Sequence, residues 1–155
     1  MMKYKIMMFS FLVFCSSVVK ADTTNLEYLN LANEYAKAWF KTQISTATKA
    51  DLEHYLSFLT DDVAYQHLPY DKTDEREAGG KEVLRKGMTQ WLASNVDYKV
   101  TINSINFSNN LITINYDSAT TIIDSKTKEK KVMRRHVIDT LELDGNKISV
   151  IRKYW

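Results

Sequence analysis

The sequence predicts a single α+β domain in which helices precede a mostly antiparallel sheet. Before residue 94, apolar residues recur with helical spacing in three segments, whereas from Tyr98 onward they alternate with a period of two. The chain has 155 residues, which is enough for one such domain, and it shows no internal repeat or linker. Helices gathered on one side of an antiparallel sheet are the usual packing for this order of elements.

The first 21 residues are predicted to be a secretory signal peptide. Two lysines, Lys3 and Lys5, precede an apolar run over 6–19, and this run is too short for a comfortable membrane span. Val19 and Ala21 then place small residues at the minus-three and minus-one positions of a cleavage site. We therefore expect cleavage after Ala21 and a secreted or periplasmic protein with no membrane contact after signal cleavage.

Removal of this segment changes the charge of the chain. Residues 1–21 hold three lysines and no acid, so the 21 basic and 19 acidic residues become 18 and 19, and the formal net charge falls from +2 to −1. A chain with this net charge lacks the excess of basic residues that is typical of nucleic-acid-binding proteins. The only cysteine, Cys15, leaves with the signal, so the exported domain has no disulfide and depends on its hydrophobic core.

Three helices are expected over 24–43, 50–59 and 81–93. Thr24 and Glu27 have the spacing of a capping box at the start of the first helix. The second helix leads into a short strand, "VAYQH", which a polar loop over 71–80 follows. The apolar faces of the three helices carry Leu29, Ala32, Ala36, Trp39 and Phe40, then Leu52, Tyr55, Leu56 and Leu59, and finally Leu84, Met88, Trp91 and Leu92.

Four strands are expected over 98–107, 111–123, 131–143 and 147–155, separated by "SNN", "DSKTKE" and "DGN". If Asp144-Gly145 forms a two-residue hairpin turn, Leu141 pairs with Ile148 and Asp139 with Val150. This register predicts one apolar face and one polar face for the last hairpin. The apolar face would hold Val137, Asp139, Leu141, Ile148, Val150 and Tyr154, and the polar face Arg134, His136, Thr140, Glu142, Lys147, Ser149 and Lys153.

The stretch "LTDDVAYQHLPY", followed by "GGKEVL" and closed by "HVIDTLELDGNKISVIRKYW", resembles the nuclear transport factor 2-like superfamily. This superfamily includes the polyketide-cyclase (SnoaL-like) and ketosteroid-isomerase families. The resemblance covers about residues 25–155 of the expected domain over 22–155, and it lies in the order and spacing of the elements more than in single motifs. It implies a cone-shaped fold, in which a curved, mainly antiparallel sheet is wrapped by three helices around an apolar pocket.

The resemblance to ketosteroid isomerases suggests three catalytic residues. Their general-base aspartate lies five residues after the second acid of an Asp-Asp pair, and the same count from Asp62 reaches His67. Their oxyanion hole uses a tyrosine of the first helix and an aspartate of a "VID" stretch, which correspond here to Tyr35 and Asp139. Histidine in place of aspartate still permits proton transfer near neutral pH, but it departs from the steroid-type enzymes.

"YQHLP" is also similar to a segment that holds the attacking water in limonene-epoxide-hydrolase-like proteins. Those enzymes need an Asp-Arg-Asp relay, and the aligned positions here are Tyr116, Ser118 and Lys153, so epoxide hydrolysis is disfavoured.

Each candidate also has a purely structural interpretation. His67 could instead end a strand as a hydrogen-bonded ring, Asp139 could form a salt bridge with Arg152 or Arg135, and Tyr35 could be a core residue. The residues expected to line a pocket for a flat or cyclic apolar ligand could also simply fill the core. These residues are Trp39, Tyr65, Met88, Trp91 and Tyr116.

The three histidines, His54, His67 and His136, show no metal-site spacing, and we expect neither a metal nor another cofactor. The leading hypothesis is a cofactor-free isomerase, lyase or cyclase acting on a small apolar or cyclic molecule, in which His67 moves a proton while Asp139 and Tyr35 stabilise an oxyanion. The alternative is a non-catalytic ligand-binding or protein-interaction module on the same fold. Because many relatives are dimers, the resemblance also raises a homodimer as a hypothesis.

Overall fold

The computed structural model describes residues 16–70, 75–93, 97–123 and 127–155, with side chains from Asn25 onward. The described elements are three helices and five strands, and their order confirms the predicted α+β class. The helices are α1 (Ser16–Gln43), α2 (Lys49–Leu56) and α3 (Gly80–Trp91). The strands are β1 (Leu59–Leu68), β2 (Asp97–Ser108), β3 (Leu111–Ile123), β4 (Lys130–Asp144) and β5 (Lys147–Tyr154). The last four strands lie within one residue of their predicted bounds.

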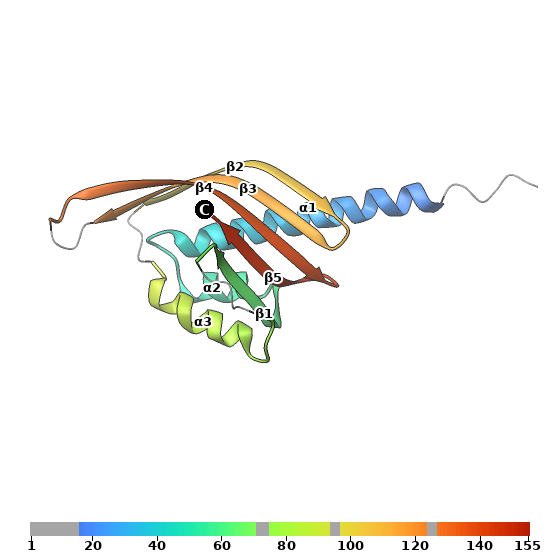
Figure 1. Cartoon of the computed structure of the whole chain (residues 1–155), viewed down its shortest axis with the longest axis horizontal. Helices are drawn as coiled ribbons and strands as arrows, with labels where there is room; N and C mark the ends of the chain where they lie inside the picture. Colours follow the sequence, from blue (N-terminus) through green and yellow to red (C-terminus); the bar gives the residue numbers. More distant parts are fainter. Residues whose placement is uncertain (1–15, 71–74, 94–96, 124–126) are drawn as a thin grey trace, which may run out of the picture.

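The five strands form one mixed sheet in the order β1-β5-β4-β3-β2. Strands β2 to β5 are the predicted antiparallel meander, and β1 joins its edge by pairing in parallel with β5. Figure 1 shows β2, β3 and β4 arching over α1, with α2 and α3 packed beside β1 at the other end of the sheet. The three helices therefore cover the concave face of the curved sheet.

Helix α1 ends at Gln43, as predicted, but it begins at Ser16 instead of Thr24. The segment before Thr24 contains no proline or glycine that would stop a helix. Most of the predicted signal peptide lies outside the described residues. None of the described helices is long and apolar enough to cross a membrane.

Helix α2 is shorter than predicted, because the chain turns after Leu56 and Leu59 already begins β1. Its start is fixed by a capping box: the Thr48 hydroxyl accepts from the backbone N–H of Asp51, whose carboxylate accepts from the backbone N–H of Thr48.

The hydrophobic core lies where α1 and α2 meet the concave face of the sheet. The ring of Tyr55 in α2 packs against Tyr35 and Trp39 of α1, with centroids 5.6 and 5.3 Å away. Strand residues that face these rings are fully buried, among them Ile112, Ile114, Leu141, Ile148 and Ile151. Alternation along β3 and β4 supplies this apolar face, as the period of two predicts.

The predicted register of the last hairpin is wrong. Gly145 and Asn146 are the central turn residues, so Asp144 pairs with Lys147 and Leu143 with Ile148. Gly145 has φ +60° at the first central position, which is the conformation of a turn that requires glycine there. The strong turn signal was correctly located, but its centre lies one residue later than expected.

A β-bulge at Ser149 then shifts the pairing again. Glu142 pairs with Val150 and Asp139 with Lys153, and the Ser149 hydroxyl donates to the Glu142 carbonyl at 3.2 Å. An extra residue in one strand reverses the face of every residue beyond it. Lys153, predicted on the polar face, therefore shares the concave face with Asp139. Val150 and Tyr154, predicted beside Asp139, pair with Glu142 and Ile138 on the opposite face.

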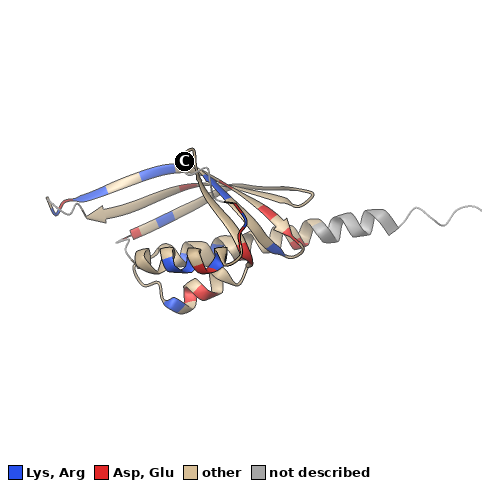
Figure 2. Cartoon of the chain, turned by 60° about the horizontal axis from the view of Figure 1, so that its bottom comes forward, with Lys and Arg blue, Asp and Glu red and all other residues tan. Residues whose placement is uncertain are grey.

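Charged residues gather on particular strands and helices. Figure 2 shows basic segments along the first half of β4 and mixed charges on α2 and α3. On the outer face, the side chain of Arg152 forms an ion pair with the side chain of Glu142, whose cross-strand neighbour is Val150. The predicted alternatives for Asp139, a salt bridge with Arg152 or Arg135, do not form.

Two glycines of α3 provide a test of this packing. A Cβ on Gly80 would lie 2.3 Å from the Val63 carbonyl oxygen of β1, whereas nothing lies within 4 Å of one on Gly87. We expect Gly80→Ala to destabilise the fold by about 1–3 kcal/mol, as overpacking does. Gly87→Ala should stabilise it by about 0.5–1 kcal/mol through helix propensity. Urea unfolding of both variants measures the difference, and equal effects would show that α3 does not pack on β1 this closely.

Candidate functional site

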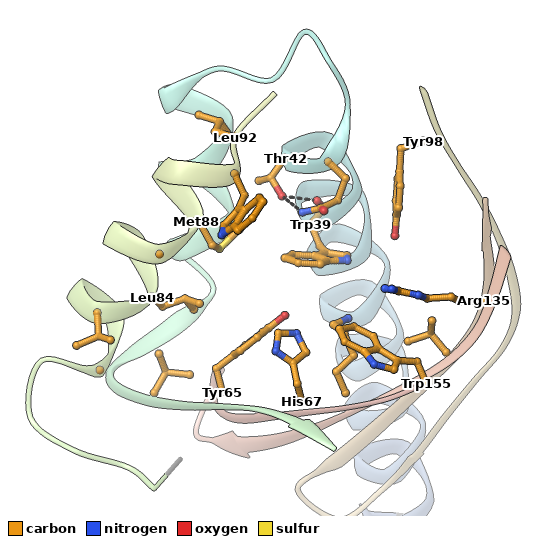
Figure 3. A pocket seen from close by; sticks show the side chains of 18 of the residues that line it. Trp39, Thr42, Tyr65, His67, Leu84, Met88, Leu92, Tyr98, Arg135 and Trp155 are labelled. Carbon is orange, nitrogen blue, oxygen red and sulfur yellow. Dashed lines mark hydrogen bonds between the residues drawn. The ribbon is translucent and has the colours of Figure 1, made fainter. Parts of the chain in front are cut away.

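A cavity of about 650 Å³ opens between the concave face of the sheet and helices α1 and α3. In Figure 3, Trp39 enters it from α1, Met88 and Leu84 from α3, and Tyr65 and His67 from β1, while Tyr98 and Arg135 lie on the opposite wall. The wall is mostly aromatic and aliphatic, and a volume of this size suits a small organic ligand. The lining includes Trp39, Tyr65, Leu84, Met88, Trp91, Leu92, Tyr98, Tyr116, Met133, Val137 and Trp155.

His67 lies on the cavity wall as part of a stack of rings. Its imidazole meets Tyr65 edge to face, with centroids 4.7 Å apart, and Trp155 at 4.6 Å on another side. The guanidinium of Arg135 lies 4.8 Å from the Trp155 ring centroid. Strand alternation predicts Tyr65 and His67 on one side of β1, and the structure confirms this. The stack holds the imidazole in one orientation at the cavity edge.

The floor of the cavity carries a buried lysine. The ammonium of Lys153 donates to both carboxylate oxygens of Asp139, at 2.6 and 2.5 Å, and to the Tyr116 hydroxyl at 2.8 Å. It also lies 4.6 Å from the ring centroid of Trp39. The side chains of Lys153 and Asp139 are each only 2% exposed. Lys153 lines the cavity, whereas Asp139 lies behind it.

Burial and mutual attraction shift the pKa values of Asp139 and Lys153 in opposite directions. Desolvation raises the pKa of Asp139, and the nearby Lys153 ammonium works against that rise. Desolvation lowers the pKa of Lys153, and Asp139 opposes that fall. Burial thus brings the two pKa values toward each other, which makes proton transfer within the pair easier than between the same groups in water.

The register places three of these residues in one line across the sheet. His67 of β1 pairs with Lys153 of β5, and Lys153 pairs with Asp139 of β4. Paired residues have side chains on the same face with Cβ atoms about 5 Å apart. We call His67, Lys153 and Asp139, together with the Tyr116 hydroxyl, the polar row. It places groups that can carry a proton side by side along the floor of a mainly aromatic and aliphatic cavity.

The predicted site residues divide into two groups. His67 and the five predicted ligand-binding residues, Trp39, Tyr65, Met88, Trp91 and Tyr116, all line the cavity. Tyr35 is 1% exposed within the core, beside Tyr55, and Asp139 does not line the cavity but contacts two residues that do, Lys153 and Tyr116. The predicted meeting of Tyr35 and Asp139 at an oxyanion hole is therefore not what the geometry shows.

Sequence reasoning missed Lys153, Tyr98, Arg135 and Trp155 as cavity residues. The signal for Lys153 was present, because an apolar-face aspartate needs a cation, but the predicted register put Lys153 on the wrong face. Of the positions aligned with the epoxide-hydrolase relay, Tyr116 and Lys153 do meet. Among the described residues, no group of three acidic, histidine or cysteine side chains is placed to hold a metal ion.

The ion pair is testable by a double-mutant cycle. Lys153→Met should destabilise the fold by about 3–5 kcal/mol, because it leaves Asp139 buried without a partner. Combining it with Asp139→Leu should recover most of that loss, since no charge then remains buried. The exposed pair Lys37–Glu34 is the control, and Glu34→Ala should change stability by less than about 0.5 kcal/mol. Urea unfolding measures these three variants and Asp139→Leu alone, and additive losses in the double variant would contradict a coupled pair.

Buried tyrosines predict a loss of stability at alkaline pH. Burial raises the pKa of Tyr98 to about 12 and raises the pKa values of four others further, namely Tyr35, Tyr55, Tyr65 and Tyr116. The unfolded chain ionises its tyrosines near pH ~10, so above about pH 10.5 it binds fewer protons than the folded protein. Stability should therefore fall as the pH rises in this range. Tyrosinate absorbance, followed in buffer and in urea, should show these groups ionising only on unfolding.

No protein-family model matches the sequence, and no curated protein is similar to it. Solved structures do resemble the fold. An NTF2-like protein from Anabaena variabilis is 15% identical, with a TM-score of 0.60 over 83% of this chain and 88% of that chain. An LEH-like epoxide hydrolase from M. tuberculosis is 17% identical, with a TM-score of 0.59 over 83% and 82%. A protein with a ketosteroid isomerase-like fold from Catenulispora acidiphila is 15% identical, with a TM-score of 0.59 over 81% and 84%. At these identities the likeness concerns the fold, and the chain has the nuclear transport factor 2-like fold that its sequence predicts.

Proposed function

We propose that the protein is a cofactor-free isomerase or lyase that moves a proton next to the carbonyl group of a small, apolar, cyclic or flat molecule. The observation that carries this proposal is the polar row on the floor of an aromatic cavity. An apolar wall favours the body of such a molecule, and a few convergent polar groups orient its one polar function.

His67 is the proposed base. Imidazole titrates near pH ~6.5 without perturbation, so it takes and returns protons around neutrality. Its ring is held at the cavity wall by Tyr65 and Trp155, which restricts the direction from which it meets a ligand. A base positioned in this way typically contributes about 10²- to 10⁴-fold to the rate.

Tyr116 and Lys153 are the proposed stabilisers of the negative oxygen that forms when the proton leaves. The Tyr116 hydroxyl accepts from the Lys153 ammonium at 2.8 Å, which polarises its own O–H, and its contact with Asp139 is long, at 3.4 Å. Donors fixed in advance in a largely apolar cavity stabilise developing charge more than water does. Asp139 then has a supporting role, because it holds the ammonium in place.

The proposed site of action is outside the cytoplasm, after removal of residues 1–21. Support comes from the apolar run and the cleavage pattern of the sequence. Ala32 is the first residue in α1 whose described side chain is buried, so a cut after Ala21 would remove none of the described core. The mass of the protein recovered from culture medium or periplasm tests the cut.

The function is testable by hydrogen exchange into small cyclic ketones, starting with cyclohexanone in D₂O. The wild-type protein should accelerate loss of the protons next to the carbonyl, as followed by NMR. His67→Ala should slow this by about 10²-fold or more, because the base is absent. His54→Ala is the matched control, since His54 is exposed on α2 outside the cavity, and it should exchange at the wild-type rate.

Ligand binding is measured in the same samples by thermal shift, because a ligand that binds the folded state stabilises it. Binding of ketones without any exchange would identify a ligand-binding module instead of an enzyme. Absence of both would contradict the proposed function.

A further inference from the structure

We propose that Lys153 is an amine nucleophile, which forms a covalent iminium with an aldehyde or an unhindered ketone bound in the cavity. The inference rests on the proposed function, since it needs a carbonyl compound in the same cavity, but it names the reactive group and the substrate class. The basis is the position of one lysine side chain, on the cavity floor and between an acid and a phenol.

Lys153 differs from the other described lysines in its surroundings. It is the single lysine whose described side chain is fully buried, whereas the side chains of Lys37 and Lys99 are 73% and 77% exposed. An ammonium in water stays protonated at neutral pH and cannot attack a carbonyl. Burial favours the neutral amine, and an amine in an apolar pocket is the usual form of a nucleophilic lysine. Desolvation lowers the pKa of Lys153, in the direction that this chemistry needs.

Asp139 can accept the proton that the Lys153 ammonium must lose before its nitrogen attacks a carbonyl. Its two oxygens lie 2.5 and 2.6 Å from the Lys153 nitrogen, and burial raises its pKa. A proton moving from the ammonium to the carboxylate leaves a neutral amine and a neutral acid. Neither then carries a charge in the cavity floor, which removes the cost of keeping two ions away from water.

The reaction balances with these groups alone. The amine nitrogen attacks the carbonyl carbon, a C–N bond forms, and one amine hydrogen moves to the oxygen to give a carbinolamine. Asp139 returns its proton by way of the Tyr116 hydroxyl, which contacts Asp139 and lines the cavity, and the protonated oxygen leaves as water, which breaks the C–O bond while the iminium forms. One positive charge is present before and after, on the ammonium and then on the iminium, and it faces the same carboxylate. The carboxylate that pairs with the ammonium thus also pairs with the iminium of the covalent product.

The polar row connects this step with the proposed proton transfer. His67 is the cross-strand neighbour of Lys153. The proposed base would therefore lie near the substrate carbon next to the one that bonds to the Lys153 nitrogen. An iminium withdraws electrons more strongly than a carbonyl, which makes the neighbouring C–H more acidic. Iminium formation would therefore assist proton removal by His67, and the two groups would act on adjacent atoms of one substrate.

The test is reductive trapping of the full chain with benzaldehyde and sodium cyanoborohydride at about pH 7. Benzaldehyde is flat and apolar and has no hydrogen next to its carbonyl, so the result does not depend on proton transfer by His67. Hydride reduces the iminium to a stable secondary amine, which peptide mass spectrometry assigns to a residue. Lys153 should be modified at least about 10-fold faster than Lys37 and Lys99, because fewer than about one in a thousand exposed lysines is neutral at this pH.

Two controls locate the reaction in the cavity. Toluene has the shape of benzaldehyde but no carbonyl, so an excess should slow modification of Lys153 and leave Lys37 and Lys99 unaffected. The same reaction in urea should remove the difference between the three lysines, because the unfolded chain exposes them all.

Modification of Lys153 at the rate of Lys37 or below it, in folded protein that binds benzaldehyde by thermal shift, would overturn the inference and leave the proposed function standing. Absence of any benzaldehyde or ketone binding would overturn both. Rapid trapping at Lys153 without ketone exchange would support the inference and contradict the role proposed for His67.

Discussion

The buried ion pair between Asp139 and Lys153 connects the last two strands on the floor of the cavity. Taking two charges out of water is costly, and their attraction repays that cost only when the geometry is close and the remaining donors are satisfied. Here the Lys153 ammonium reaches both carboxylate oxygens, the Tyr116 hydroxyl and the face of Trp39. The positions of β3, β4, β5 and α1 are thus all tied to one charged group.

The bulge at Ser149 allows the ion pair to form, because it places Lys153 on the same face of the sheet as Asp139. Without it, the strand beyond the turn would present its other face to the cavity, and Lys153 would point to the convex side. The sheet therefore carries a local irregularity that brings a cation to Asp139 on its concave face. Bulges often occur next to functional sites, where they redirect a side chain.

The concave face of the sheet serves two purposes along its length. Near the hairpin turn it meets α1 and α2 and is filled by apolar side chains, including Leu141, Ile148 and Ile151. Toward the other end of β4 and β5, the same face lines the cavity with Val137, Arg135 and Lys153. The polar row lies at the boundary between the packed core and the cavity. A ligand in the cavity would meet hydrogen-bond donors there that the packed sheet holds in place.

The order of elements, the bounds of the last four strands and the side of β1 that carries Tyr65 and His67 follow from the sequence, because periodicity and turn residues are local properties. The presence of an acid on the concave face also follows, since Asp139 alternates with apolar residues of one strand. The tertiary structure alone decided which cation meets Asp139, because the bulge reverses the face of Lys153 and the turn, centred one residue later, then pairs Lys153 with Asp139, without changing any local pattern. It also decided that Tyr35 belongs to the core and Trp155 to the cavity, since both depend on how distant segments pack.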